Sequence, residues 1–225
     1  MNVDAQQMYY LLLLAPGLLF SLTVHEFAHA RMALAYGDPT AKLLGRVSLN
    51  PLRHLDPMGT IMLALTAFGK APFGWAKPVP YNPLNVHPLR LGQIMISLAG
   101  PLSNLALAVV TFGLVKLWMA LDVHMSEAVF TAGFTMFLKL TVCNVCLAVF
   151  NIIPLYPLDG HHVVRELLPL RQSDEFMHWQ VRYGSIVLLA LLVGPWLLRN
   201  TGSEFQFNPI GSLLGLIARG VYALV

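Results

Sequence analysis

Charged residues are scarce in this chain of 225 residues, because Asp, Glu, Lys and Arg together make up only 11% of it. Soluble domains typically carry about 25%. Hydrophobic residues reach 56%. This composition excludes a disordered chain, a coiled coil and most soluble enzymes, and it indicates a protein solvated largely by lipid. With 14 Lys and Arg against 11 Asp and Glu, no basic surface is large enough to predict a nucleic-acid partner.

Cysteine is also rare, and the two that are present, Cys143 and Cys146, cannot form a disulfide framework. Their C-x-x-C lies inside an apolar segment with no second pair, so packing between helices is favoured over zinc binding or redox chemistry. The first residues carry Asp4 but no Lys or Arg, which a signal peptide would need. We therefore expect the first apolar run to stay in the mature protein.

Five apolar segments are long enough to be considered as helices crossing the ~30 Å hydrocarbon core. They run over about 8–36, 91–121, 128–153, 183–198 and 209–225. A sixth run, at 58–68, is too short and is interpreted as re-entrant or interfacial. The sequence thus predicts an all-α polytopic membrane protein with about five to six transmembrane segments.

The positive charges gather in two of the connections between these segments, at about 31–90 and 165–182. Both connections lie on one side of the membrane if the short run at 58–68 does not cross. The positive-inside rule makes that side cytoplasmic, with the N-terminus outside and the C-terminus inside.

The first apolar segment contains His25, Glu26 and His29 in a His-Glu-x-x-His pattern. Residues four apart share a helix face, so the two imidazoles can bind one zinc ion. Glu26 lies about 100° round the helix and can act as a general base on a nearby water. The pattern could instead mark a helix end at the interface, but ionisable groups within apolar segments are costly and usually functional.

A catalytic zinc site needs a third protein ligand, and Asp159 is the best candidate. It follows two prolines at the end of the third segment, at a depth similar to that of His29 on the same predicted side. Taken alone, Asp159 before Gly160 could equally be a turn residue.

Two motifs make the chain resemble the site-2 protease family of intramembrane zinc metalloproteases: His25-Glu26-Phe27-Ala28-His29 and Asn151-x-x-Pro154-x-x-Pro157-Leu158-Asp159-Gly160. Further likeness lies in Gly45-Arg46-Val47-Ser48-Leu49-Asn50-Pro51, Trp75-Ala76-Lys77-Pro78-Val79-Pro80 and Ala99-Gly100-Pro101-Leu102-Ser103-Asn104. The likeness spans about residues 20–165.

The resemblance implies one zinc ion per chain, held by His25, His29 and Asp159, with Glu26 as the base. It implies that Asn151 contacts the substrate backbone or steadies the tetrahedral intermediate. It also implies a small membrane-associated β element in the first cytoplasmic loop, whose edge strand would hold an unwound substrate. The strand-like stretch Arg46–Leu49 fits this expectation.

Other polar residues near these motifs have less certain roles. Asn104 and Asn144 could face the active-site cavity and bind substrate, although hydrogen bonding between helices would explain Asn144 equally well. His161 and His162 stand where many family members have a second glycine, and we interpret them as gating or surface residues rather than ligands. Lys139, deep in the third segment, could snorkel, pair with a carboxylate or line a water path.

The function that these residues predict is zinc-dependent cleavage of a peptide bond in or near a transmembrane segment of another membrane protein, as in regulated intramembrane proteolysis. We expect one membrane domain over 1–225, with a catalytic core at about 8–165 and C-terminal helices at about 180–225. A prokaryotic plasma membrane, with the active site toward the cytoplasm, is the expected location. The alternatives are a membrane metal transporter or sensor, a non-catalytic binder of membrane helices, and another class of membrane zinc protease.

Overall fold

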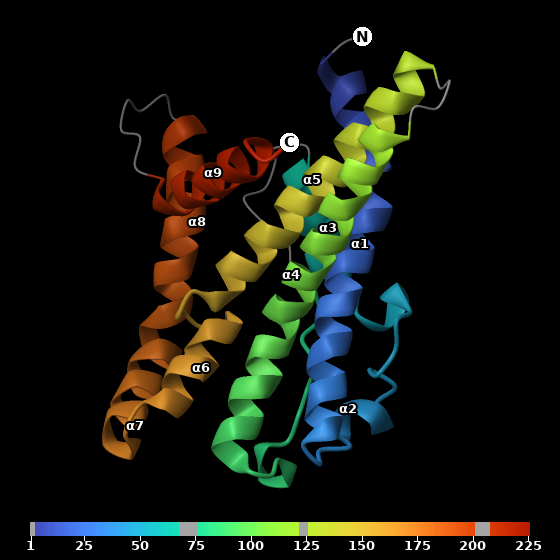
Figure 1. Ribbon diagram of the computed structural model, residues 1–225. Coiled ribbons are helices and arrows are strands. Elements are labelled where there is room, and N and C mark those ends of the chain that lie inside the picture. The colour runs from blue at the N-terminus through green and yellow to red at the C-terminus, as the bar shows by residue number, and fades with distance from the viewer. Residues whose placement is uncertain (1–2, 68–75, 122–125, 201–207) are drawn as a thin grey trace.

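The computed structural model describes residues 3–67, 76–121, 126–200 and 208–225, and within these ranges the regular elements are helices (Figure 1). The α-helices are α1 (Val3–Ala35), α2 (Thr40–Leu43), α3 (Pro57–Ala67), α4 (Leu89–Ala120), α5 (Glu127–Ile152), α6 (Asp159–Leu167), α7 (Leu170–Trp179), α8 (Ser185–Asn200) and α9 (Pro209–Tyr222). A π-helical turn, Gln180–Gly184, joins α7 to α8. The helical class agrees with the composition of the sequence.

Helices α1, α4 and α5 form the centre of the molecule, with α4 packed against both of the others (Figure 1). Their contacts are made largely by small side chains, each at most 6% exposed: Ala30, Ala33, Ala99, Ala108 and Ala148. Small residues let helix backbones approach closely, which is how helices associate where no hydrophobic effect drives them together. This close packing brings residues of α1, α4 and α5 that are far apart in the sequence close together in space.

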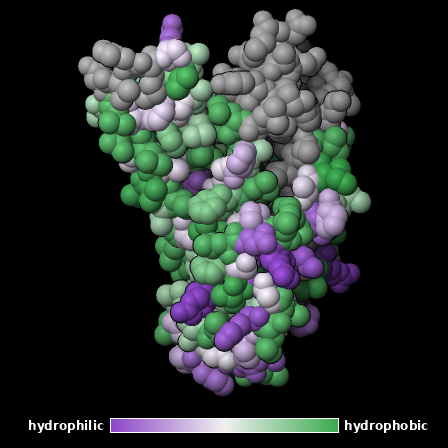
Figure 2. All heavy atoms as spheres, turned by 90° about the vertical axis from the view of Figure 1, so that its right-hand side faces the viewer, coloured by the Kyte–Doolittle hydropathy of each residue, from purple (hydrophilic) through white to green (hydrophobic). Residues whose placement is uncertain are grey.

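Three helical stretches of the described chain are long and apolar enough to cross a membrane: Leu89–Ala120, Glu127–Ile152 and Leu170–Leu198. They correspond to the predicted spans at 91–121, 128–153 and 183–198, which the first two match to within a few residues at each end. Many of their large apolar side chains remain exposed, among them Val109, Val110, Leu117, Val181, Ile186 and Leu189. Figure 2 shows hydrophobic residues over the upper part of one face and hydrophilic ones gathered toward the lower end. Such a surface fits a lipid bilayer.

Helix α9 differs from the predicted fifth span. Its 14 residues make it a shorter apolar helix of about 21 Å, less than the ~30 Å that a perpendicular span needs. It packs against α5 and α8, at the end of the molecule where α1 begins (Figure 1). The start of α1 and helix α9 therefore lie toward the same end of the molecule (Figure 1).

Hydrogen bonds join the beginning of the long connection between α1 and α4 to its end. The backbone N–H of His87 donates to the carbonyl of Tyr36 at 2.9 Å. The Asp38 carboxylate accepts hydrogen bonds from Thr40 on one side, and from the Asn82 backbone and the Asn85 side chain on the other. Since these contacts hold the two ends of the connection together, α1 ends and α4 begins at the same end of the molecule. The intervening α3 has only 11 residues and is too short to cross.

The prediction of a β element is wrong for the part of this connection that the structure describes. Residues 68–75, and with them Trp75, lie outside the described residues. Arg46–Leu49 forms bends rather than a strand, because the chain turns at Gly45 (φ +66°) and the Arg46 N–H bonds back to Ala41. The Arg46 guanidinium then donates to the carbonyls of Arg53, Lys77 and Pro78. Pro78 and Pro80 have no N–H to offer to a ladder. Hydrogen bonds from a buried arginine, rather than strand pairing, thus hold these segments of the connection together.

Candidate metal centre

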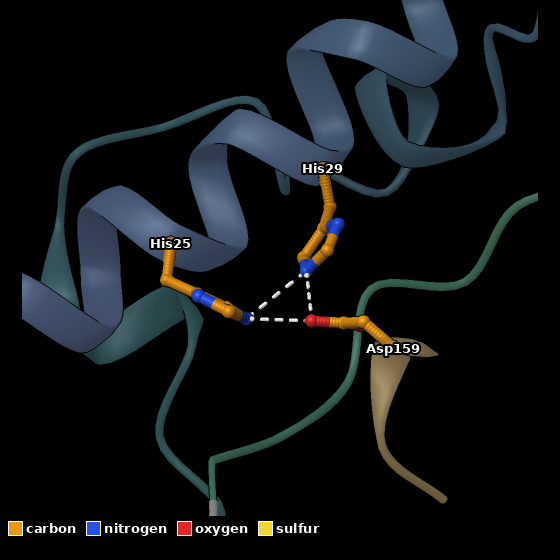
Figure 3. A group of neighbouring side chains, drawn as sticks. All are labelled: His25, His29 and Asp159. Atoms are coloured by element: carbon orange, nitrogen blue, oxygen red, sulfur yellow. Dashed lines mark hydrogen bonds and ion pairs between the residues drawn. The ribbon is translucent and has the colours of Figure 1, made fainter. Parts of the chain in front are cut away.

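Three side chains from two distant parts of the sequence converge between α1 and α6: His25, His29 and Asp159 (Figure 3). The two imidazole Nε2 atoms are 3.0 Å apart, and they lie 3.3 and 3.4 Å from Asp159 Oδ2. Zinc ligands at ~2.0–2.2 Å in tetrahedral geometry are separated by about 3.3–3.5 Å. The three atoms therefore approach the spacing of three corners of a tetrahedron, which fits a small tetrahedral cation.

Helix α1 supplies both imidazoles from successive turns of one face, as the sequence predicts. The other ring nitrogen of each histidine is held from α4. His29 Nδ1 donates to the carbonyl of Ile96 at 2.7 Å, and His25 Nδ1 lies 2.5 Å from Asn104 Oδ1. A carbonyl can only accept, so Nδ1 of His29 carries a proton and its Nε2 can offer a lone pair.

Asp159 completes the cluster as the first residue of α6. Its Oδ2 is buried without a hydrogen-bond partner, facing the two Nε2 atoms. Burial acts to raise the pKa of Asp159, but the neighbouring His29 and His25 imidazoles outweigh it and hold the pKa well below its ordinary value. Three acceptor atoms at this spacing need a cation or a proton among them.

The turn before Asp159 is fixed by a side chain of the π-helical turn between α7 and α8. Gln180, only 1% exposed in the π-helical turn, donates from Nε2 to the Pro154 carbonyl and accepts from the Tyr156 N–H through Oε1. Gly160 follows Asp159 with its Cα against α5, where a Cβ would lie 2.0 Å from the carbonyl oxygen of Ile152. Gln180 was not foreseen from the sequence, because no local pattern links residue 180 to this turn.

Gly100 leaves the space in which the two imidazoles lie. A Cβ at this position would come within 2.3 Å of His29 Nε2 and 2.6 Å of His25 Nε2. Contacts this short do not occur, so any side chain here would displace the imidazoles or the helix. In the sequence Gly100 stands only as part of the Ala99–Asn104 motif, and the structure shows that the two histidines lie against it.

A cavity of about 470 Å³ opens beside the three converging side chains. Glu26 and Asn151 line it together with His25, His29 and Asp159, so the structure brings together the principal residues singled out in the sequence. Its other walls are largely apolar: Leu22, Leu147, Phe150, Leu188, Leu192, and Ala76, Pro78, Val79 and Tyr81 of an extended segment. Such a space suits an apolar peptide whose backbone approaches a few polar groups.

Asn104 and Asn144 lie away from this cavity. They are 0% and 1% exposed and are absent from its walls. Asn104 is hydrogen-bonded to His25 and to Asn144, and Asn144 continues to Ser21 on α1. The sequence analysis did not single out Ser21, although it precedes His25 by one helical turn and shares its face.

The remaining candidates take neighbouring positions. His161 is 1% exposed with Nδ1 against the Leu158 carbonyl, whereas His162 borders the cavity. Burial and the adjacent His161 lower the pKa of His162 to about 4, so it is neutral near pH 7. Cys143 and Cys146 are free thiols on α5, and Cys146 Sγ lies 3.9 Å from the Leu214 carbonyl, as expected for helix packing. Lys139 lies on the same helix.

Comparison with known proteins places these features in a family. The family model described as Peptidase family M50 matches residues 116–193. YwhC of Bacillus subtilis (strain 168), by its name a proposed zinc metalloprotease, is 39% identical over 208 residues, covering 88% of this chain and 92% of YwhC.

Two further relatives share the name Rip2 and the same proposed activity. The Rip2 of Mycolicibacterium smegmatis is 30% identical over 210 residues, which are 90% of this chain and 76% of the relative. The Rip2 of Mycobacterium tuberculosis (strain H37Rv) is 29% identical over 215 residues, 88% of this chain and 77% of the relative. No solved structure matches the chain. From the family match and the relationship to YwhC over nearly the whole of both chains, this protein is a member of peptidase family M50.

Proposed function

We propose that this protein is a site-2-type intramembrane zinc endopeptidase that cleaves a peptide bond in or near a transmembrane segment of another membrane protein. The observation that carries the proposal is the convergence of His25, His29 and Asp159 beside a cavity that Glu26 also lines. The names of the relatives, zinc metalloproteases, support the same chemistry. The apolar helices supply the membrane setting.

His25, His29 and Asp159 would hold one zinc ion, which when bound supplies a Lewis acid for the scissile carbonyl and lowers the pKa of water. Glu26 takes the proton of the attacking water and returns it to the leaving amine. Asn151 donates a hydrogen bond from its amide to an oxygen of the substrate backbone, because it lines the same cavity. The apolar walls accept the side chains of an unwound membrane segment and limit the entry of bulk water.

The location we propose is a prokaryotic plasma membrane, in which the lower end of the molecule in Figure 1 faces the cytoplasm. Helices α2, α6 and α7, the end of α1 and the start of α4 lie toward that end (Figure 1), and they carry Arg31, Lys42, Arg90, Arg165 and Arg171, which supports this orientation. The cleaved bond would then lie toward the cytoplasmic side of the substrate helix. The 1–225 unit would act as one membrane domain, because α4 of the core and α8 of the C-terminal part both contribute walls to the cavity.

Glu26→Gln is the variant that tests this function. We expect it to bind about one zinc per chain, as wild type does, and to lose at least about 100-fold of its cleavage rate, because a carboxamide cannot accept the proton. Zinc is measured by mass spectrometry of the purified protein. Cleavage is measured with a panel of single-span peptides in proteoliposomes, and the cut is located by mass spectrometry.

Glu175→Gln is the matched control, since Glu175 is an exposed carboxylate paired with Arg171 on α7. It should cleave at the wild-type rate. Wild-type protein that holds zinc but cuts no member of the panel would favour a metal transporter or sensor. Wild-type protein that folds without binding zinc would contradict the proposal.

A further inference from the structure

A chain of buried hydrogen bonds runs from His25 through α4 to α5 and back to α1. His25 Nδ1 lies 2.5 Å from Asn104 Oδ1, Asn104 Nδ2 donates to Asn144 Oδ1 at 2.9 Å, and Asn144 Nδ2 donates to Ser21 Oγ at 3.0 Å. Its members are between 0% and 7% exposed. In a membrane domain such groups are rarely retained without a role.

Which group donates and which accepts in each hydrogen bond of this chain follows from the contacts of Asn144. Asn144 is also 2.9 Å from the Leu140 carbonyl, which can only accept, so the Asn144 NH₂ must point there and its oxygen toward Asn104. That oxygen requires the NH₂ of Asn104, which leaves the Asn104 oxygen facing His25. His25 must then carry its proton on Nδ1.

A proton on Nδ1 leaves the lone pair of neutral His25 on Nε2, the atom that faces His29 and Asp159. We propose that Asn104 and Asn144 are positioning residues that fix the tautomer and orientation of His25 for metal binding, an inference that rests on the zinc site proposed above. Their role is thus to prepare a ligand rather than to touch the substrate. It also makes the metal site depend on the packing of α5 against α1 and α4.

The burial of the two asparagines excludes the simpler role of contacting substrate in this conformation. Neither lines the cavity, and their carboxamides already have partners within the helical core. Ser21 ends the chain by donating to the Gly17 carbonyl at 2.9 Å, so its hydroxyl can accept from Asn144. Both hydrogens of the Asn144 NH₂ are used, one toward Ser21 and one toward the Leu140 carbonyl.

The experiment measures zinc affinity rather than cleavage, by competition with a chromophoric chelator, together with the visible spectrum of the cobalt-substituted protein. Asn104→Leu should bind zinc about 10–100-fold more weakly than wild type, as is usual when the partner of a metal-binding histidine is removed. Asn104→Asp keeps an acceptor for His25 Nδ1 and should bind more tightly than Asn104→Leu. Asn144→Leu frees the Asn104 carboxamide to turn, and should lose affinity in the same direction.

Thr141→Val is the matched control for a merely structural loss. Thr141 is a 3% exposed residue of α5 whose hydroxyl bonds to Thr111 on α4 and to the Phe137 carbonyl, with no contact to either histidine. It removes a buried bond between the same two helices, and should lower thermal stability while leaving zinc affinity and the cobalt spectrum unchanged.

Wild-type zinc affinity and an unaltered cobalt spectrum in Asn104→Leu would overturn the inference and leave the proposed function intact. An equal loss of affinity in Thr141→Val would overturn it too, since helix packing would then be the cause. If Asn104→Leu does not fold, Asn144→Leu decides: reduced affinity in a folded protein supports the inference, and wild-type affinity overturns it. A wild type without zinc would overturn both proposals together.

Discussion

Single atoms decide whether two histidines in a helix can share one ion. His25 and His29 are placed by helical periodicity, but their Nε2 atoms reach a common point only because α4 presents the bare Cα of Gly100 to them. Gly100 thus provides the space that the imidazoles occupy, whereas Asn104 and the Ile96 carbonyl fix the orientation of the rings. We therefore expect a methyl group at position 100 to disrupt metal binding as much as the loss of one histidine ligand would.

Gly100→Ala is accordingly expected to abolish zinc binding, because its Cβ would lie 2.3 Å from His29 Nε2. Bound zinc, counted by mass spectrometry, should fall from about one per chain to almost none. Gly113→Ala on the same helix is the control, since its Cβ would have no atom within 4 Å, and alanine in a helix is favourable by up to about 1 kcal/mol. Full zinc occupancy in folded Gly100→Ala would show that the helices separate without cost.

In its described part, the connection between α1 and α4 is held in place by hydrogen bonds of two buried side chains, Asp38 and Arg46, rather than by strand pairing. Asp38, fully buried, ties its beginning to Asn82 and Asn85 near its end. The Arg46 guanidinium donates to three carbonyls and thereby holds Lys77 and Pro78, which belong to the extended segment that lines the cavity. Burial lowers the pKa of Arg46, while the negative charge of Glu26 acts in the opposite direction. The placement of this wall thus depends on two ionised side chains.

Asp38→Asn should destabilise the protein in a pH-dependent way. Burial acts to raise the pKa of Asp38, but hydrogen bonds from Thr40, Asn85 and Asn82 outweigh it and set the pKa below the ordinary value of 3.8. The ionised carboxylate therefore stabilises the fold above about pH 4, and this contribution is lost as the pH falls through the folded-state pKa.

Thermal unfolding in detergent from pH 3 to pH 7 measures this effect. Wild type should exceed Asp38→Asn by about 1–3 kcal/mol at neutral pH, because the amide leaves a buried donor without an acceptor. The difference should shrink at the acid end of the series. A difference that is constant over the whole range would contradict the assignment to ionisation of Asp38.

For the whole molecule, the metal site is one of the contacts between the N-terminal helix α1 and the part of the chain that follows α5. Helix α6 rests mainly on α4, and the cluster of His25, His29 and Asp159 is where it faces α1 (Figure 3). Gln180 in turn connects the turn before Asp159 to the C-terminal helices. A cation at this point would therefore join the N-terminal helix to everything after residue 154.

Removing zinc should lower the stability of the entire fold. At a free zinc concentration about 100 times Kd, binding contributes about 2.7 kcal/mol, or roughly 5–10 °C in Tm for a chain of this size. Differential scanning fluorimetry with and without a chelator measures the shift. His25→Ala should have the low Tm under both conditions, and a chelator effect of equal size in that variant would place the stabilising zinc elsewhere.

The helical class, the three helices apolar enough to cross a membrane and the clustering of His25, His29 and Asp159 could be predicted from the sequence, because hydropathy and helical periodicity are local properties. The catalytic roles of Glu26 and Asn151 remain predictions. Tertiary structure alone decided the rest. The strand expected at Arg46–Leu49 does not form, because the chain turns at Gly45 and the Arg46 N–H bonds back to Ala41. The positions of Asn104, Asn144 and Gln180 depend on how α4, α5 and the π-helical turn pack, and hydrogen bonds between residues 24 to 123 positions apart leave no periodic trace in the chain.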